Sequence, residues 1–92
     1  MIRTFRHRGL KRFHERGDPS RLSATQVSRI EIVLDDLDAA TRPRDLDLPG
    51  NRLHQLKGER RGQWSVTISG NWRIIFRFEA GEPCDVDLVD YH

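Results

Sequence analysis

The sequence has a single cysteine and no long apolar run, and both absences exclude classes of protein. Cys84 alone cannot form an internal disulfide framework, which is typical of proteins in a reducing cytoplasm. No apolar run is long enough to span a membrane, and the basic start of the chain lacks the apolar core of a secretory signal. We expect one cytoplasmic domain over residues 1–92 without membrane contact. Cys84 is interpreted as a packing residue, because no sequence cue activates its thiol.

Motifs for metal, cofactor and nucleophilic chemistry are also missing. The four histidines are scattered, without HExxH or His/Cys ligand spacing, so no zinc site is expected. The sequence shows no GxSxG elbow, no phosphate-cradling glycine loop and no evident Cys–His pair. The aspartates of residues 35–38 are interpreted as a solvated helix face, because nothing supplies a matching fourth ligand. We therefore expect no metal and no cofactor.

Charge is plentiful but unevenly distributed along the chain. Residues 1–21 carry seven basic and two acidic residues, and residues 51–77 carry six basic and one acidic. Residues 22–50 and 78–92 are acidic, and the last block has no Lys or Arg. A fold that joins the two basic blocks would present a cationic surface to a polyanion. The alternative is a set of solvated faces balanced by the acidic blocks, and charge alone does not decide between them.

Two apolar-alternating runs dominate the middle of the chain. Trp64–Ile68 and Trp72–Phe78 flank residues 69–71, whose Gly and Asn tolerate positive φ, so we predict a β-hairpin. Alternate residues from Trp72 onward form an apolar face that can pack against helices. The opposite face projects the guanidinium groups of Arg73 and Arg77 from a rigid strand, an arrangement suited to holding a phosphate.

Helical signals precede the hairpin. Gly9–Arg16 predicts a short helix, with Gly17 as its C-terminal stop. Ser23 to Gln26 matches the capping-box pattern, and the apolar stripe that follows predicts a second helix to about Ala40. The stripe consists of Val27, Ile30, Leu34 and Leu37.

Short strands complete the expected fold. They are predicted at Ile2–Phe5, within Arg52–Gly58 and at Asp85–His92. The connector Thr41–Gly50 has two prolines and a glycine, so it has room for one helical turn, and Leu46 and Leu48 are expected to fix it to the core. Early helices and late hairpins favour an α+β fold, with an antiparallel β-sheet and two N-terminal helices packed on one face.

Three groups of residues could carry chemistry. They are His54 with Lys57, Arg73 with Arg77, and the terminal Asp90-Tyr91-His92. Each group alone is also at home on a solvated surface. Together they supply what metal-free RNA cleavage requires: a base for the 2′-hydroxyl, cations for the phosphorane and an acid for the 5′-oxygen. Imidazole can serve as acid or base near neutrality, a carboxylate can orient it, and a tyrosine can stack on a nucleobase.

Four segments carry a resemblance to a known family. They are FRHRGL (5–10), LDLPGNRLHQLKG (46–58), WSVTISGNWRIIFRF (64–78) and DVDLVDYH (85–92). Their combination resembles HigB-type toxins of the RelE/ParE superfamily of bacterial toxin–antitoxin systems, over essentially the whole chain. The resemblance implies a RelE-like fold in β-α-α-β-β-β(-β) order. It also implies a ribosome-dependent mRNA endonuclease that cuts in the decoding site and inhibits translation.

The resemblance further implies partners and site residues. The implied partners are a HigA-type helix-turn-helix antitoxin, through which alone operator DNA is bound, and the ribosome with its small-subunit rRNA and mRNA. The implied catalytic group is His54, Asp90, Tyr91 and His92, with either histidine as general base or acid. The implied phosphate-stabilising residues are Lys57 and Arg73. Gln55 departs from the family, in which proline is frequent at this position.

One geometric difficulty and two alternative functions accompany this interpretation. Strict alternation places Asp90 and His92 on the presumed core face, opposite to Arg73, so we predict a bulge or frayed geometry near Val89. Arg77 and the basic N-terminal region are expected to dock ribosomal RNA, or else to be solvated surface. The alternatives are a non-catalytic ParE-like toxin that binds a protein such as DNA gyrase, and a structural RNA-binding module.

Overall fold

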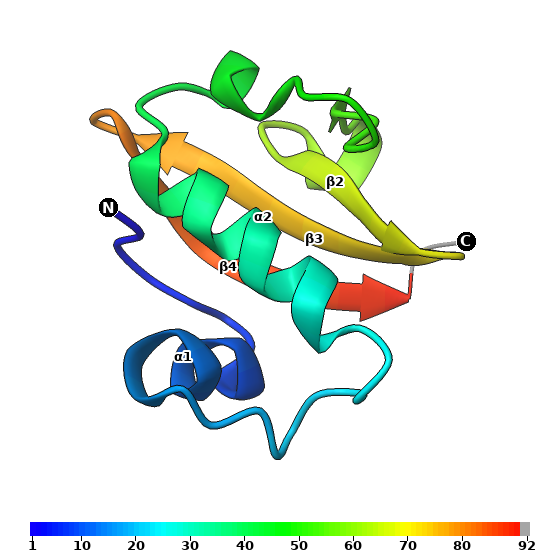
Figure 1. Ribbon diagram of the computed structural model, residues 1–92. Helices are drawn as coiled ribbons and strands as arrows, with labels where there is room; N and C mark the ends of the chain where they lie inside the picture. Colours follow the sequence, from blue (N-terminus) through cyan, green and yellow to red (C-terminus); the bar gives the residue numbers. More distant parts are fainter. Residues whose placement is uncertain (91–92) are drawn as a thin grey trace.

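The computed structural model describes residues 1–90, which form helices on one side of a four-stranded antiparallel β-sheet (Figure 1). The helices and strands are α1 (Arg8–Arg16), α2 (Val27–Ala39), β1 (His54–Gln55), β2 (Trp64–Ser69), β3 (Trp72–Glu79) and β4 (Glu82–Asp90). Two 3₁₀ turns, η1 (Pro43–Leu46) and η2 (Gly58–Arg60), lie in the connections before and after β1. This is the α+β fold expected from the sequence. No helix of the described residues is long and apolar enough to cross a membrane.

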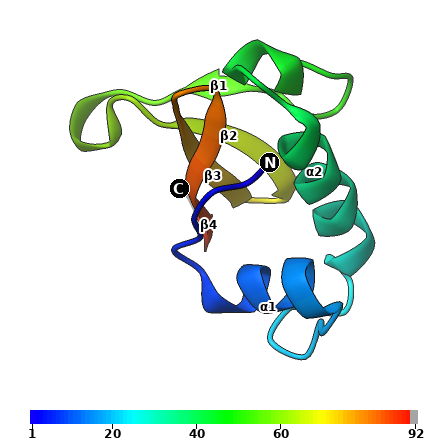
Figure 2. The ribbon, with the colours of Figure 1, turned by 90° about the vertical axis from the view of Figure 1, so that its left-hand side faces the viewer.

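The sheet has the order β1-β2-β3-β4, so neighbours in sequence are neighbours in space. Helix α2 lies across one face of the sheet, and α1 lies beside β4 at the edge (Figures 1 and 2). Within residues 1–90, no helix covers the opposite face. We call that surface the open face, and it carries the candidate site described below.

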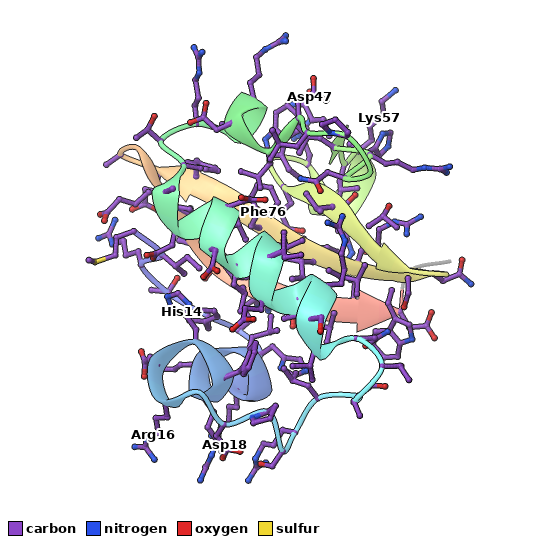
Figure 3. All side chains as sticks on the ribbon, viewed as in Figure 1. His14, Arg16, Asp18, Asp47, Lys57 and Phe76 are labelled. Atoms are coloured by element: carbon purple, nitrogen blue, oxygen red, sulfur yellow. The ribbon has the colours of Figure 1, made fainter. Side chains whose placement is uncertain are left out.

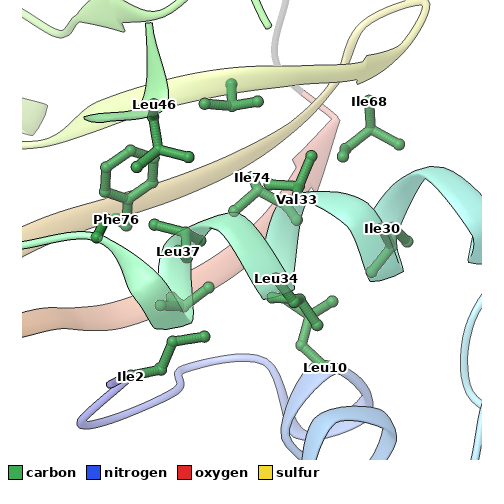
Figure 4. Packing of buried hydrophobic residues seen from close by; sticks show 13 residues of the cluster. Ile2, Leu10, Ile30, Val33, Leu34, Leu37, Leu46, Ile68, Ile74 and Phe76 are labelled. Carbon is green, nitrogen blue, oxygen red and sulfur yellow. The ribbon is translucent and has the colours of Figure 1, made fainter. Parts of the chain in front are cut away.

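The core lies between α2 and the covered face of the sheet (Figure 4). Ile30, Leu34 and Leu37 of the expected stripe are buried, whereas Val27 is only half-buried. Val33 takes the remaining buried position, since it follows Ile30 by three residues and precedes Leu37 by four. These side chains join a cluster that includes Val66, Ile68, Ile74, Phe76 and Val86 from the strands. Burial of each such side chain contributes roughly 1.5–3 kcal/mol, so this layer holds α2 on the sheet.

The N-terminal cap predicted for the second helix is not formed, and the first helix has a cap that was not predicted. The capping box is wrong, because α2 begins only at Val27 with Gln26 as a cap that makes no side-chain capping bond. Gln26 instead turns toward the sheet, where its Nε2 donates to Ser69 Oγ at 2.9 Å. Helix α1 is capped by His7, whose Nδ1 accepts from the Leu10 amide at 3.1 Å. The predicted stop at Gly17 is confirmed, since its φ of 69° is left-handed.

The predicted first strand is reduced to a single parallel bridge between Phe5 and Val86. The N-terminal segment nevertheless runs beside β4 and bonds to its backbone. The Arg6 amide donates to Val86 O at 2.8 Å, and the Val86 amide donates to Thr4 O at 3.2 Å. Strand β4 is irregular at this point.

The irregularity is a bulge at Asp85, and the bulge predicted near Val89 is absent. Ile75 pairs with Asp87 while Arg77 pairs with Cys84, so β4 has one extra residue between these pairs. Asp85 has a φ of 53°, and its amide donates to Thr4 Oγ1 at 2.8 Å. The attached N-terminal segment therefore places the bulge here, and pairing beyond it is regular to the end of the strand.

The connector from α2 to β1 follows the prediction only in part. It contains one 3₁₀ turn, η1, and Leu46 is buried as expected. Leu48 is 42% exposed, so its expected role in the core is wrong. The polar side chain of Asn51 is buried instead, at 1% exposure, and bonds to the Leu46 carbonyl.

Candidate active site

A hollow of about 350 Å³ lies on the open face of the sheet. It is lined by Arg52, His54, Ser65, Thr67 and Arg73. Two of the site residues predicted from the sequence, His54 and Arg73, therefore share one cavity. Among residues 1–90, the lining consists of an imidazole, two guanidinium groups and two hydroxyls, and it includes no carboxylate.

Strand pairing explains why these residues converge. His54 of β1 lies opposite Ser65 of β2, and Thr67 of β2 lies opposite Arg73 of β3. Residues directly opposite in antiparallel strands project to the same face, and residues two apart along a strand do so as well. Hairpin register alone therefore brings a residue of the 46–58 segment into one cavity with an arginine almost twenty positions later.

The floor of the open face is less polar than its rim. Ile75 is 1% exposed although it lies between two arginines on β3, and Ser65 is 3% exposed. Arg73 is half-buried, and its Nη1 donates to the Gly70 carbonyl at 3.1 Å. That bond holds the guanidinium at the β2–β3 turn and restricts its side-chain rotamers, and within residues 1–90 the remaining N–H groups make no other hydrogen bond.

Sequence analysis missed three of the lining residues. Ser65 and Thr67 alternate with buried Val66 on β2, and this alternation was the signal that could have placed them beside Arg73. Arg52 lies inside the conspicuous RLHQLKG segment, two residues before His54. Its φ of 49° had no signal in the sequence, since glycine is the residue expected there.

The other predicted site residues lie outside the hollow or outside the described residues. Lys57 is exposed at the N-terminus of η2, three residues beyond His54 (Figure 3). Asp90 is the last residue of β4 and pairs with Trp72, beside the Arg73–Val89 pair. Its pairing gives it the same face as Trp72, so the parity difficulty raised by the sequence persists. Residues 91 and 92, Tyr and His, lie outside the described residues.

Arg77 lies on the open face but belongs to a separate ion-pair cluster. Its Nε donates to Asp85 Oδ2 at 2.6 Å and its Nη1 to Glu79 Oε2 at 2.8 Å. These bonds hold the pKa values of Asp85 and Glu79 below their usual range and raise the pKa of Arg77. Cys84 opposite it is buried, and desolvation raises the pKa of its thiol. This cluster closes the bulged end of the β3–β4 ladder.

A second hollow, of about 280 Å³, lies against α1 and is strongly basic. It is lined by Arg8, Lys11, Arg12, Glu15, Arg16 and Arg21. Arg12 Nε donates to Asp18 Oδ2 at 2.7 Å. The Asp18 pKa falls to about 2, first because its carboxylate accepts the Ser20 amide and then because of Arg12. Arg16 and Asp18 mark this end of the molecule, far from Lys57 (Figure 3).

The fold and the open-face hollow define a small α+β protein whose exposed sheet surface carries a hollow lined by one histidine and two arginines. The model for the RelE-like toxin HigB of type II toxin–antitoxin systems matches residues 3–92. The chain is 42% identical to Endoribonuclease HigB of Proteus vulgaris over 92 residues, which is 100% of both chains. It is 31% identical over 83 residues to Toxin HigB-1 of Vibrio cholerae serotype O1, covering 88% of this chain and 87% of that one. The chain therefore belongs to the HigB-like family of type II toxins, as its motifs indicated, and such a toxin has an antitoxin as partner.

Proposed function

We propose that this toxin cleaves mRNA in the decoding site of the ribosome and thereby inhibits translation. Endoribonuclease activity follows from its family and from its full-length similarity to the Proteus vulgaris enzyme. The observation that supports a cleavage site on the open face is the shared hollow of His54 and Arg73, with the last strand ending beside Arg73.

The reaction would use general acid–base chemistry without a metal ion. A base removes the 2′-hydroxyl proton, the 2′-oxygen attacks phosphorus, and the bond from phosphorus to the 5′-oxygen breaks as an acid protonates that oxygen. The products are a 2′,3′-cyclic phosphate and a 5′-hydroxyl. His54 is in the hollow, and His92 is the second candidate for acid or base, because it follows the end of β4 by two residues.

The remaining roles are assigned by the charge of each residue and by its position in the chain. Arg73 would stabilise the phosphorane, since its guanidinium lines the hollow from a rigid strand. Lys57 would contact a flanking phosphate from its exposed position after His54. Asp90 would orient a proton-transfer group and Tyr91 would contact the nucleotide. Strand β4 ends at Asp90, whose partner Trp72 is the neighbour of Arg73 in β3.

Arg77 is better suited to a structural role than to RNA binding. Its guanidinium already bonds to Asp85 and Glu79, and an RNA phosphate would have to compete with both carboxylates. Docking to ribosomal RNA is instead assigned to the basic hollow of α1, whose Arg8 and Lys11 make no ion pair within residues 1–90. The antitoxin is proposed to be of the helix-turn-helix HigA type and to be the only link to operator DNA.

The test is brief induction in cells, followed by mapping of mRNA 5′ ends. We expect new ends inside reading frames with the wild-type toxin and with an Arg44→Gln control, whose exposed arginine lies on η1. The ends should disappear with His54→Ala and with His92→Ala, provided that thermal melting shows both variants folded. Intact mRNA together with arrested replication would overturn the proposal and favour a gyrase-binding toxin.

A further inference from the structure

Arg52 combines two unusual features at the rim of the open-face hollow. Its φ is 49°, a left-handed backbone conformation that residues other than glycine rarely adopt. Two other such residues occur within residues 1–90: Ala80 lies in the β3–β4 turn and Asp85 in the bulge. Arg52 directly follows a turn, in which the Asn51 amide donates to the Leu48 carbonyl at 3.0 Å, but it is neither a turn residue nor part of a strand bulge.

A buried hydrogen-bond cluster fixes the backbone immediately before Arg52. Asn51 Nδ2 donates to the Leu46 carbonyl at 2.9 Å, and Asn51 Oδ1 accepts from Arg29 Nη2 at 2.9 Å. The Thr67 amide donates to the Asn51 carbonyl at 2.9 Å, and Arg29 Nη2 also donates to the Thr67 carbonyl at 2.9 Å. Helix α2, the η1 connector and β2 therefore all hold Asn51, and the strained conformation of the next residue is imposed by the whole fold.

The side chain of Arg52 has no competing partner in the part of the chain that the structure describes. It is exposed, lines the hollow with His54 and Arg73, and makes no ion pair or hydrogen bond within residues 1–90. Arg77, by contrast, is bonded to two carboxylates. As far as the described residues 1–90 line it, the hollow thus contains two guanidinium groups and no carboxylate to neutralise them.

We propose that Arg52 is a phosphate-binding residue of the hollow, fixed in place by the Arg29–Asn51 cluster and acting together with Arg73 on the RNA backbone. The inference rests on the proposed function, because it takes the ligand to be an RNA phosphate. A planar guanidinium donates two parallel hydrogen bonds to phosphate oxygens, and a strained backbone position persists where the fold holds it. Two arginines from different elements can contact one phosphate, or two consecutive ones, while His54 lies beside them.

Cleavage on mRNA-programmed ribosomes, measured under single-turnover conditions, provides the first test. We expect Arg52→Gln to lower the rate constant about 10- to 100-fold, and Arg52→Lys to fall between this variant and wild type. Arg44→Gln, which removes the same charge from an exposed site on η1, should remain within about twofold.

Arg52→Gly separates a binding role from a structural one. Glycine adopts the left-handed conformation without strain, so the melting temperature should rise by about 4 °C while cleavage falls as far as in Arg52→Gln. Unchanged cleavage in Arg52→Gln and Arg52→Gly would overturn the proposal. Loss of cleavage that only accompanies loss of melting temperature would overturn it as well.

A binding arm distinguishes failure of this inference from failure of the proposed function. Wild-type protein is titrated with a 2′-deoxy trinucleotide, which cannot be cleaved, and the arginine Nε–H signals are followed by NMR. We expect the Arg52 and Arg73 signals to shift and the Arg44 signal to stay in place. A shift at Arg52 in a toxin that cleaves no mRNA would contradict the proposed function while supporting the phosphate site. No shift at Arg52 would overturn the phosphate site itself.

Discussion

At the scale of single residues, side chains on the open face divide into those committed to the fold and those available to a ligand. Arg77, Asp85 and Glu79 belong to the first group, because they bond to one another at the bulge. His54 and Arg73 belong to the second, since both line the hollow. The alternation of side chains along β3 places Arg73 and Arg77 on one face. Their roles differ because Arg77 bonds to two carboxylates, whereas Arg73 bonds to a backbone carbonyl.

We expect the contribution of the Asp85 carboxylate to stability to depend on pH. Its pKa is lowered in the folded state, chiefly by Arg77, so its contribution is present above the unfolded pKa of about 4 and is lost as pH falls through the folded pKa. Asp85→Asn should therefore lower the free energy of unfolding at pH 7, and with it the melting temperature; the loss should be less than about 1 kcal/mol because the pair is over a third exposed. Melting curves from pH 7 to pH 2 should show the difference shrinking below about pH 4.

The control for this prediction is Asp35→Asn, on the exposed face of α2. Within residues 1–90, the Asp35 carboxylate makes no ion pair. It should follow the wild-type curve at every pH. A deficit in Asp85→Asn that stays constant down to pH 2 would show that the pairing with Arg77 is not its cause.

At the scale of elements, α1 contains a glycine, Gly9, at a position where helix propensity alone would favour alanine. A Cβ at Gly9 would lie 2.8 Å from His7 Cε1 and 3.0 Å from Arg21 Cβ, so the capping imidazole would have to move. Alanine improves helix propensity by about 1 kcal/mol, whereas loss of a cap and strain against neighbours cost about 1–3 kcal/mol. We expect Gly9→Ala to lower the free energy of unfolding by about 1 kcal/mol in urea titrations.

Lys11→Ala on the exposed side of α1 supplies the comparison. It keeps the cap and should change stability by less than about 0.5 kcal/mol. Stabilisation by Gly9→Ala would show that the His7 cap contributes little.

The connector before β1 depends on one buried amide. Asn51→Ala would remove two buried hydrogen bonds, the one to the Leu46 carbonyl and the one from Arg29 Nη2, at a cost of about 1–3 kcal/mol. Leu48→Ala, three residues earlier and largely exposed, should cost under about 0.5 kcal/mol. Urea titration of both variants measures the difference, and equal effects would contradict the assigned role of Asn51.

Elements with strong periodicity were predictable, and features set by tertiary contacts were not. The β2–β3 hairpin and α2 follow from period two and from the i, i+3, i+7 spacing of apolar residues. The bulge at Asp85 depends on Thr4, which is about eighty residues away in sequence, so no local pattern indicates it. The hollow shows the same division, because strand parity predicts the direction of Arg73 whereas the placement of Arg52 depends on the buried Asn51.

At the scale of the whole molecule, two cationic regions lie on different parts of the surface. One is the open-face hollow, which contains two arginines, and the other is the basic hollow of α1. Helix α1 lies at the β4 edge of the sheet, and β1, which carries His54 of the open-face hollow, forms the opposite edge (Figure 2). A large polyanion can contact both at once, while a short RNA strand fits only one.

Salt dependence of ribosome binding tests this division. The double variant Arg8→Gln with Lys11→Gln removes two cations from the α1 hollow. We expect weaker binding and a slope of log affinity against log salt that is smaller by about 1–2, because each phosphate contact contributes about 0.7–0.9. Arg44→Gln should leave the slope unchanged. An unchanged slope in the double variant would remove α1 from the ribosome-binding surface.

The most direct test of the open-face hollow as the cleavage site is a structure of the toxin on a ribosome programmed with mRNA. The 2′-hydroxyl at the cut position is replaced by hydrogen, so that the substrate stays intact. We expect the scissile phosphate within hydrogen-bond distance of the Arg73 guanidinium, with the His54 imidazole beside the 2′ or 5′ position. A phosphate bound on another surface, with the hollow empty, would contradict the proposed site.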